Sequence, residues 1–294
     1  MSQVPLANWN GKLAPLDQIN VPVLDRGFLF GDGVYEAMRI YAGQVFLLDE
    51  HWARLARSLR ELSLEADLDR LRRRLTDTLV HSGVQDGLIY LQITRGAGPR
   101  RTHAFPRPAG PPNELIWIEG YASADPMAEN RERGVEAVTF PDWRWGRRDI
   151  KSINLLANCL AAEHAKKAGA FEAILIDPTG HFTEGSHTSL FGIRDGVLFT
   201  YPSGPEILPG CTRAFLLRLA GQIGLTVETT PLSENDLPNI DELFLTGTTS
   251  EVIGIVKVDG KLISTGRVGP ITRRLSDAYH QEVRRWLTTC STMT

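Results

Sequence analysis

The chain has 294 residues, enough for one large domain or two of ordinary size. Its 42% hydrophobic and 23% charged content is typical of a globular protein with a substantial core. A formal net charge of -3 gives no electrostatic reason to expect nucleic acid or an anionic membrane as a partner.

Cysteine and histidine usage indicates neither disulfides nor a metal site. The three cysteines, Cys159, Cys211 and Cys290, lack metal or redox spacing, and the seven histidines are scattered. The first six residues lack the charged leader and apolar run of a signal peptide, and no apolar run approaches the ~18 residues that cross a membrane. We therefore expect a cytoplasmic protein without a metal ion.

The first half of the chain is predicted to combine strands with two helices. The pair Asn10-Gly11 is typical of a hairpin turn, and Asp49 is a candidate N-cap for the first helix. In chain order we expect a hairpin (6–13), a glycine-punctuated loop (25–33), a strand (34–41) and its return (45–47), helices (49–62 and 66–80), and strands (87–95 and 115–121) separated by an irregular segment (96–106).

A change in composition at residues 123–126 predicts a linker between domains 1–122 and 127–294. Beyond it, one helix is expected to start at Asn154 and stop at Gly169. The other expected elements are strands (135–140, 171–177, 182–183, 188–193, 197–200, 242–246, 253–258 and 262–264) and helices (212–223 and 271–287). The chain is predicted to form two α+β domains.

Lys151 stands between an extended segment and the helix that starts at Asn154. Backbone on both sides can remove such a lysine from solvent and make its amine a nucleophile. The position alone is a weak signal, because most lysines are solvated surface charges. The strength of the catalytic interpretation of Lys151 depends on which other functional groups occur along the chain.

Three further segments contain groups that a charged aromatic cofactor would need. Glu184 lies between predicted strands, where a solvated turn acid is the ordinary interpretation and a carboxylate facing a ring nitrogen is the functional one. Segment 210–213 opens a helix whose free N–H groups suit an anion, and segment 246–250 ends a strand with hydroxyls and a glycine. A lysine, a carboxylate and a phosphate cradle together suit pyridoxal 5'-phosphate.

Several motifs follow one another along nearly the whole chain. They are Asp25-Arg26-Gly27, Phe30-Gly31-Asp32-Gly33-Val34-Tyr35-Glu36, the loop from Thr94 to Pro106, Asp149-Ile150-Lys151-Ser152-Ile153-Asn154, Thr183-Glu184-Gly185-Ser186, Leu208-Pro209-Gly210-Cys211-Thr212-Arg213 and Thr248-Thr249-Ser250-Glu251. In this order they resemble the class IV, or fold-type IV, pyridoxal-phosphate aminotransferases, and most closely their D-amino-acid branch. The resemblance implies a two-domain α+β fold, with a small N-terminal α/β sandwich and a larger C-terminal pseudo-barrel.

The resemblance also implies roles for individual residues. Lys151 resembles the Schiff-base lysine, and Glu184 resembles the partner of the pyridine nitrogen. Arg54 would otherwise be interpreted as a solvated helix charge, but it resembles a phosphate ligand. The complete set of implied cofactor-binding residues is Lys151, Glu184, Arg54, Leu208, Cys211, Thr212 and Thr248.

The substrate residues implied by the resemblance are Tyr35, Arg101 and His103, which would hold the α-carboxylate. An arginine fork suits a carboxylate, and a phenol and an imidazole add donors. The loop has one extra residue, so Arg100 is the alternative to Arg101. In this family the loop reaches the site of a neighbouring subunit, which implies a homodimer.

The implied activity is a ping-pong transamination from a D-amino acid to 2-oxoglutarate or pyruvate. Branched-chain L-aminotransferases usually follow the lysine with a Gly-Gly-Asn-Tyr-like run, which 152–155 lacks. 4-Amino-4-deoxychorismate lyase commonly has arginine where Leu155 stands, and neither it nor an R-selective amine transaminase needs a carboxylate trap. The remaining alternative is a non-catalytic protein that binds pyridoxal phosphate.

Overall fold

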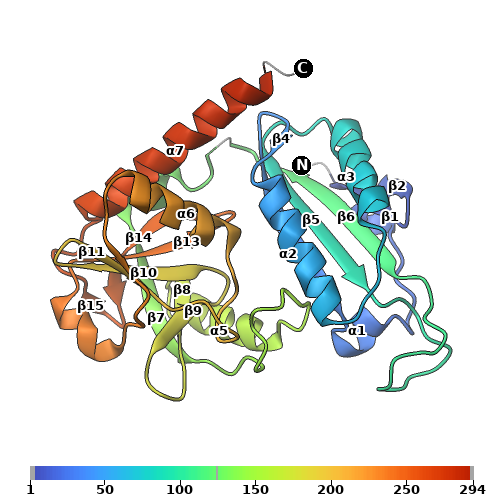
Figure 1. Cartoon of the computed structure of the whole chain (residues 1–294), viewed down its shortest axis with the longest axis horizontal. Helices are drawn as coiled ribbons and strands as arrows, with labels where there is room; N and C mark the ends of the chain where they lie inside the picture. The colour runs from blue at the N-terminus through green and yellow to red at the C-terminus, as the bar shows by residue number, and fades with distance from the viewer. Residues whose placement is uncertain (1–3, 124, 292–294) are drawn as a thin grey trace. The chain divides into compact units, whose positions relative to one another are not determined.

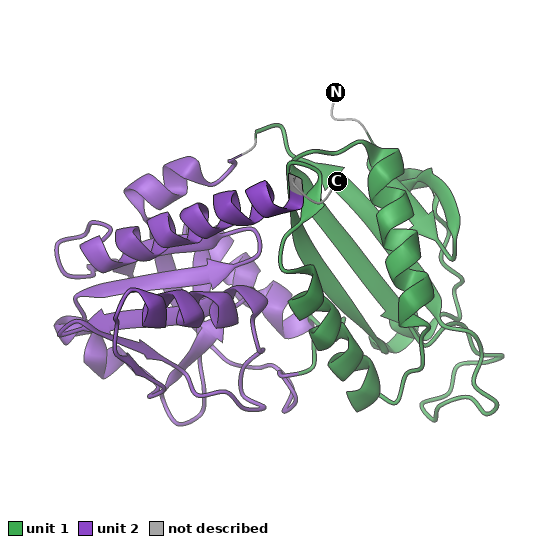
Figure 2. Cartoon of the chain, turned by 45° about the horizontal axis from the view of Figure 1, so that its top comes forward, with its two compact units in different colours: residues 1–124, 150–155 green, residues 125–149, 156–294 purple. Residues whose placement is uncertain are grey.

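The computed structural model describes residues 4–123 and 125–291, and its contacts divide the chain into two compact units (Figure 2). The first unit comprises residues 1–124 and 150–155, and the second comprises 125–149 and 156–294. The contacts therefore count segment 150–155 with the first unit, whereas the expected boundaries counted it with the second. The expectation about a leader falls in part on residues 1–3, and the expected linker includes Ala124; these residues lie outside the described ones.

The first unit contains a six-stranded antiparallel sheet in the order β2-β1-β6-β5-β3-β4. Its strands are β1 (Leu6–Trp9), β2 (Lys12–Pro15), β3 (Gly33–Tyr41), β4 (Gln44–Val45), β5 (Gly87–Thr94) and β6 (Asn113–Gly120). The predicted hairpin turn is confirmed, because Asn10 and Gly11 both adopt positive φ, at 54° and 92°. Side chains of β5 alternate between buried and half-buried along most of the strand, as a sheet with one covered face requires.

The described α-helices of this unit are α1 (Arg26–Phe30), α2 (Leu48–Glu61) and α3 (Leu68–Ser82), with a 3-10 turn η1 (Leu16–Gln18). Figure 1 shows α2 and α3 lying across the sheet, where they contact β3 and the β1–β6 pair respectively. The predicted Asp49 cap is wrong, because Leu47 is the N-cap and Asp49 lies in the first turn. The predicted loop at 25–33 contains α1, because the Asp25 carboxylate caps it through the amides of Gly27 and Phe28.

The second unit is built on a nine-stranded sheet, with eight strands in the order β12-β11-β10-β13-β14-β7-β8-β9 and β15 beside β14. Its strands are β7 (Val135–Pro141), β8 (Glu172–Ile176), β9 (Phe182–Gly185), β10 (Ser189–Arg194), β11 (Val197–Thr200), β12 (Val227–Glu228), β13 (Glu242–Gly247), β14 (Glu251–Val258) and β15 (Lys261–Leu262). The sheet is mixed, because β7 pairs in parallel with both β14 and β8. Many side chains of its apolar core come from β10, β13 and β14.

The helices of the second unit are α4 (Ala128–Arg133), α5 (Leu156–Lys167), α6 (Cys211–Gln222) and α7 (Pro270–Ser291), with a 3-10 segment η2 (Glu234–Asn239). The predicted stop of α5 is confirmed, because Gly169 follows it with φ 73°. The pattern missed α4 and β12, which are too short to establish a period.

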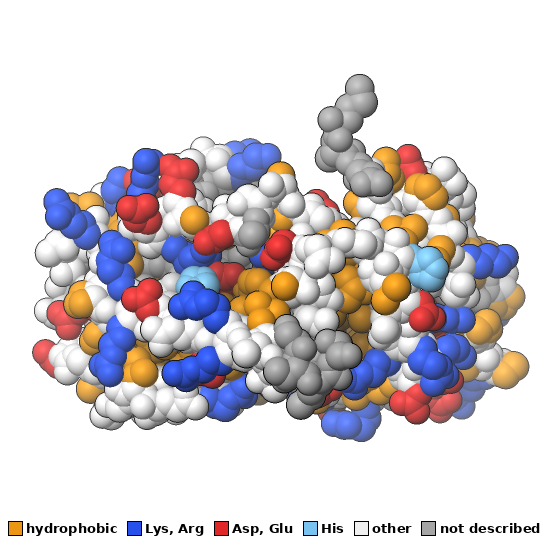
Figure 3. Space-filling model, turned by 90° about the horizontal axis from the view of Figure 1, so that it is seen from above, with side chains coloured by type: hydrophobic (Ala, Val, Ile, Leu, Met, Phe, Trp, Pro, Cys, Tyr) orange, Lys and Arg blue, Asp and Glu red, His pale blue; other side chains and the backbone are white. Residues whose placement is uncertain are grey.

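Charged side chains of both signs are found together on the surface that can be inspected (Figure 3). Figure 3 shows Lys and Arg intermixed with Asp and Glu on the face that it presents. Within residues 4–123 and 125–291, no helix combines the length and the apolar character that crossing a membrane requires. The same residues contain no cluster of His, Cys, Asp and Glu that could hold a metal ion.

Candidate active site

Lys151 lies in a backbone segment that runs against the start of β3. The amide of Tyr35 donates to the Lys151 carbonyl at 3.0 Å, and the amide of Ile153 donates to the Gly33 carbonyl at 3.1 Å. The Lys151 amide itself donates to Ser58 Oγ at 3.3 Å. The lysine is therefore held by its main chain on both sides, just before α5, as the sequence predicts.

The amine of Lys151 meets a residue that the sequence assigned to substrate binding. Its Nζ lies 4.1 Å from the centroid of the Tyr35 ring, a cation–π distance. The Tyr35 ring in turn stacks on Tyr90 at 5.6 Å, and Tyr90 stacks on Trp117 at 3.9 Å. This aromatic row fixes the surface on which the amine rests.

Arg54 is buried rather than solvated, and a carboxylate on β3 holds it. Its Nε and Nη2 donate to the two oxygens of Glu36 at 2.8 and 2.6 Å, and His51 Nδ1 lies 2.7 Å from Glu36 Oε2. Burial by itself raises the pKa of Glu36, but Arg54 and His51 outweigh it and lower that pKa to about 2. Glu36 is thus ionised at neutral pH and fixes the Arg54 guanidinium.

The irregular loop 96–106 presents Arg101 and His103 against one aromatic ring. The Arg101 guanidinium carbon lies 5.0 Å from the centroid of Phe30, and the His103 ring lies 5.4 Å from it. Within residues 4–123 and 125–291, no corresponding ring contact is found for Arg100. The loop therefore brings together the arginine and the histidine that the sequence paired.

In the second unit, Glu184 is a buried residue of β9, so its expected place in a turn between strands is wrong. Arg144 Nη1 and the amide of Leu208, the latter at 3.0 Å, both donate to Glu184 Oε1. Burial raises the pKa of Glu184, which Arg144 and the Leu208 amide only partly oppose. A further cationic group beside this carboxylate would favour its ionised form.

The turn after Glu184 is organised by another buried carboxylate, Glu172 on β8. Its Oε1 accepts from the amide and hydroxyl of Ser186 at 3.0 and 2.6 Å, and its Oε2 accepts from Thr188 Oγ1 at 2.8 Å. Because three groups of the turn donate to the two oxygens of one side chain, the turn has little freedom. The position of Glu184 therefore depends on β8 as well as on β9.

At the predicted anion site, no side chain among the described residues caps the N-terminus of α6. Gly210 is the N-cap and supplies no side chain to the helix, while Cys211 and Thr212 in the first turn are buried. Thr246, near the end of β13, carries a buried hydroxyl for which residues 4–123 and 125–291 supply no hydrogen-bond partner. Uncapped N–H groups at a helix N-terminus and an unsatisfied hydroxyl fit the phosphate of pyridoxal 5'-phosphate.

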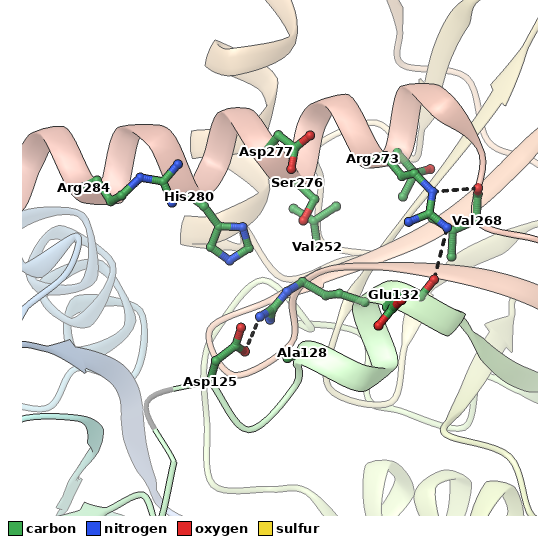
Figure 4. A pocket seen from close by; sticks show the side chains of 12 residues that line it. Asp125, Ala128, Glu132, Val252, Val268, Arg273, Ser276, Asp277, His280 and Arg284 are labelled. Carbon is green, nitrogen blue, oxygen red and sulfur yellow. Dashed lines mark hydrogen bonds and ion pairs between the residues drawn. The ribbon is translucent and has the colours of Figure 1, made fainter.

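The second hydroxyl-bearing segment, 246–250, which includes Thr248, is followed directly by Glu251. This residue adopts φ 56° and is buried, and its Oε2 lies 2.7 Å from both Arg131 Nη1 and His280 Nε2. Arg131 and His280 border a cavity of about 460 Å³ in the second unit, into which His280 projects from α7 (Figure 4). These two contacts hold Glu251 in a left-handed conformation that costs about 1 kcal/mol or more.

The sequence missed the partners of the expected residues. Glu36 gave the clearest available signal, because it occupies the same strand face as Val34 and Met38, and all three are buried. A charged residue in the buried phase of a strand requires an opposite charge. Arg144 and Glu172 gave no comparable local signal, since one lies in a charged loop and the other opens a strand.

Comparison with known proteins identifies relatives along most of the chain. The family described as amino-transferase class IV matches residues 33–258. Proteins called D-alanine aminotransferase are similar: one from Staphylococcus aureus (strain N315) is 38% identical over 280 residues, covering 93% of this chain and 96% of its own. Another from Bacillus licheniformis is 38% identical over 277 residues, covering 94% and 96%.

Solved structures of similar fold carry a different name. The branched-chain amino acid aminotransferase of Escherichia coli superposes with a TM-score of 0.85 at 27% identity, covering 95% of this chain and 94% of its own. An enzyme of the same name from T.th., solved with pyridoxamine 5'-phosphate, gives a TM-score of 0.86 at 27% identity, covering 96% and 94%.

The Glu36–Arg54 pair predicts a specific acid sensitivity. Because the folded-state pKa of Glu36 is about 2 and its ordinary value is 4.5, its contribution is complete above pH 4.5 and is lost as pH falls toward 2. This pKa difference corresponds to about 3 kcal/mol at neutral pH. We expect Glu36→Gln to lower the free energy of unfolding at pH 7 by a few kcal/mol and to flatten its fall below pH 4.5.

Urea unfolding at a series of pH values measures this effect. Glu129→Gln is the control, because Glu129 forms an exposed pair with Arg133 and should change the free energy by less than about 1 kcal/mol. Parallel pH profiles for wild type and Glu36→Gln would contradict the assignment.

Proposed function

Because the chain belongs to the class IV aminotransferases, we propose that it transfers the amino group of a D-amino acid to 2-oxoglutarate or pyruvate in a ping-pong cycle. The observation that carries the proposal is the joint placement of Arg101 and His103 against Phe30. An arginine fork with a neighbouring imidazole is suited to a carboxylate, which both substrates share. The names of the relatives give the same stereochemistry.

Pyridoxal 5'-phosphate is the cofactor, and when bound it supplies the electron sink for cleavage of the bond between the α-carbon and its hydrogen. Lys151 is the catalytic residue: its Nζ would hold the cofactor and, once the substrate amine has replaced it there, would move the α-proton. The hydrogen bonds from the Tyr35 amide to the Lys151 carbonyl and from the Lys151 amide to Ser58 Oγ fix the base of this side chain, so that its amine needs only side-chain rotation to act.

The ring and the phosphate of the cofactor use different groups. Glu184, oriented by Arg144, pairs with the pyridine nitrogen and keeps it protonated. The phosphate is held at the first turn of α6 and by the hydroxyl segment after β13. The residues that bind the phosphate are Arg54, Cys211, Thr212 and Thr248. Leu208 packs on one face of the cofactor ring.

The α-carboxylate of the substrate is bound by Tyr35, Arg101 and His103. In this assignment the loop of one copy acts in the site of a second, so the working form is a homodimer. The proposed location of this dimer is the cytoplasm. With the carboxylate and the amine of the substrate fixed, D- and L-acids direct the α-hydrogen to opposite sides, and only the acid that directs it toward Lys151 reacts, which is the origin of D-selectivity. The partners are therefore small amino and oxo acids and a second copy of the chain.

An L-specific branched-chain activity is the second candidate, and the names of the solved neighbours favour it. The relatives called D-alanine aminotransferase have the higher identity, 38% against 27%, and cover a similar share of the chain. The D-selective function is therefore the better supported of the two.

The half-reaction without an oxo acid tests the proposal directly. The holoenzyme is mixed in separate cuvettes with D-alanine, D-glutamate, L-leucine and L-glutamate, and the visible absorption of the cofactor is followed. We expect the D-acids alone to bleach it. Bleaching by L-leucine would move the protein to the branched-chain group, and a band that no amino acid bleaches would indicate a lyase, an amine substrate or a non-catalytic binder.

The two adjacent loop arginines provide a matched pair of variants. Since charge-assisted hydrogen bonds contribute about 1.5–3 kcal/mol, we expect Arg101→Ala to lower kcat/KM for D-alanine by roughly ten- to a hundredfold. We expect Arg100→Ala to remain within about twofold of wild type, as an exposed loop charge should. Steady-state kinetics of both variants decide the matter: the reverse order would assign the role to Arg100, and no loss in either would remove the loop from the substrate site.

A further inference from the structure

The loop that carries Arg101 and His103 has no regular secondary structure of its own. Between Arg100 and Pro106 no residue belongs to a helix or strand, and the side chains of Arg101, His103 and Phe105 are exposed. An exposed segment of this kind is ordinarily mobile, because few contacts oppose its conformational entropy. A group outside the loop must therefore fix its course if its side chains are to bind a substrate.

Arg26 supplies that group from the first position of α1. Its Nη1 donates to the carbonyls of Thr102 and Ala104 at 2.6 and 3.3 Å, and its Nη2 donates to the carbonyl of His103 at 3.1 Å. One guanidinium thus binds three consecutive carbonyls of the loop. These hydrogen bonds use main-chain atoms of the loop, which leaves the side chains of Arg101 and His103 available for a ligand.

The charge of Arg26 is buried and compensated. The residue is 5% exposed, and its Nε donates to Asp32 Oδ2 at 2.7 Å. The Phe30 ring, against which Arg101 and His103 lie, is 4.8 Å from the same guanidinium. Arg26 therefore contacts both the backbone of the loop and the ring that its two functional side chains share.

A second arginine ties this cluster to the rest of the unit. Arg95 also donates to Asp32, and it donates to the carbonyls of Leu62 and Ser63 at the end of α2, at 2.7 and 2.8 Å. Its guanidinium lies 3.6 Å from the centroid of Phe105 in the loop. Asp32 thus orients two arginines, one bound to the loop carbonyls and the other to the end of α2.

We propose that Arg26 is a positioning residue for substrate recognition, which holds the backbone of residues 102–104 so that Arg101 and His103 meet the substrate carboxylate. The inference rests on the proposed function, because it takes Arg101 and His103 as the carboxylate-binding pair. A planar fork is required, since a compact ammonium cannot reach three carbonyls in the same geometry. Misplacement of binding groups by about 1 Å costs up to a hundredfold in rate.

The test compares Arg26→Lys with Arg39→Lys in the holoenzyme. Arg39 is a matched control in the same unit: it is 3% exposed and donates to the carbonyls of Ile40 and Gly87 at 2.6 and 3.0 Å, away from the loop. Three quantities are measured for each: the rate of trypsin cleavage after Arg100 or Arg101, the KM for D-alanine and pyruvate, and the dissociation constant of pyridoxal 5'-phosphate.

For Arg26→Lys we expect cleavage in the loop to accelerate by about tenfold or more, because local opening exposes the chain. We expect KM for both substrates to rise roughly ten- to a hundredfold, while the cofactor dissociation constant stays within about twofold. For Arg39→Lys we expect none of these changes beyond about twofold. This pattern separates positioning of the loop from a general loss of structure.

The other outcomes overturn the inference in distinguishable ways. Unchanged cleavage and KM in Arg26→Lys would show that the loop does not depend on Arg26, with the proposed function intact. Faster cleavage with unchanged KM would show that the loop is outside the substrate site, which contradicts the proposed role of Arg101 and His103 as well. Equal effects in Arg39→Lys, or a parallel loss of cofactor affinity, would reduce Arg26 to a stability residue.

If Arg26→Lys does not yield folded holoenzyme, Phe105→Ala makes the same test. Phe105 is 51% exposed, and its ring lies 5.5 Å from the Arg26 guanidinium. Its removal should accelerate loop cleavage and raise KM in the same direction, by a smaller factor. No change in either quantity would contradict the inference.

Discussion

A buried charge is tolerated only beside an opposite charge, and this constraint determines where the candidate site residues stand. Removing one partner of a buried pair typically costs about 3–5 kcal/mol, whereas the intact pair adds little net stability. Glu36 with Arg54, Asp32 with Arg26, and Glu184 with Arg144 are pairs of this kind. Their value is positional: each fixes the direction of a guanidinium or carboxylate that the chemistry uses or that supports a residue in use.

These pairs connect regular structure to irregular structure. Glu36 projects from the middle of a paired strand, so the direction of Arg54 is determined by the sheet of the first unit. Arg26, which belongs to α1, binds the backbone carbonyls of a loop that has no regular secondary structure of its own. Glu184 belongs to β9, and the turn that follows it is fixed by a carboxylate on β8. Groups that must act together are thereby positioned by strands and helices rather than by flexible segments.

Much of the fold could be predicted from local patterns, because alternation and turn residues are local properties. The strand at 34–41 and the turn at Asn10-Gly11 are examples, and the order of motifs identified the family. The Asp49 cap failed because Leu47 opens that helix from a left-handed conformation, which no propensity anticipates. The short helix α1 was missed because five residues span little more than one turn.

The supporting partners could not be predicted, because they are distant in sequence. Arg144 and Glu184 are 40 residues apart, and Arg26 is 76 residues from Thr102. Nothing in the segment Arg144 occupies distinguishes it from the neighbouring Arg147 and Arg148. Only Glu36 carried an internal signal, as a charge in the buried phase of a strand. Tertiary pairing of charges is information that a single sequence does not display locally.

The most direct test of the account is the configuration of the product. Purified holoenzyme is incubated with pyruvate and racemic glutamate, and the alanine formed and the glutamate remaining are resolved by chiral chromatography. The account predicts D-alanine as the product, with D-glutamate consumed and L-glutamate retained. L-alanine formed at the expense of L-glutamate would contradict it.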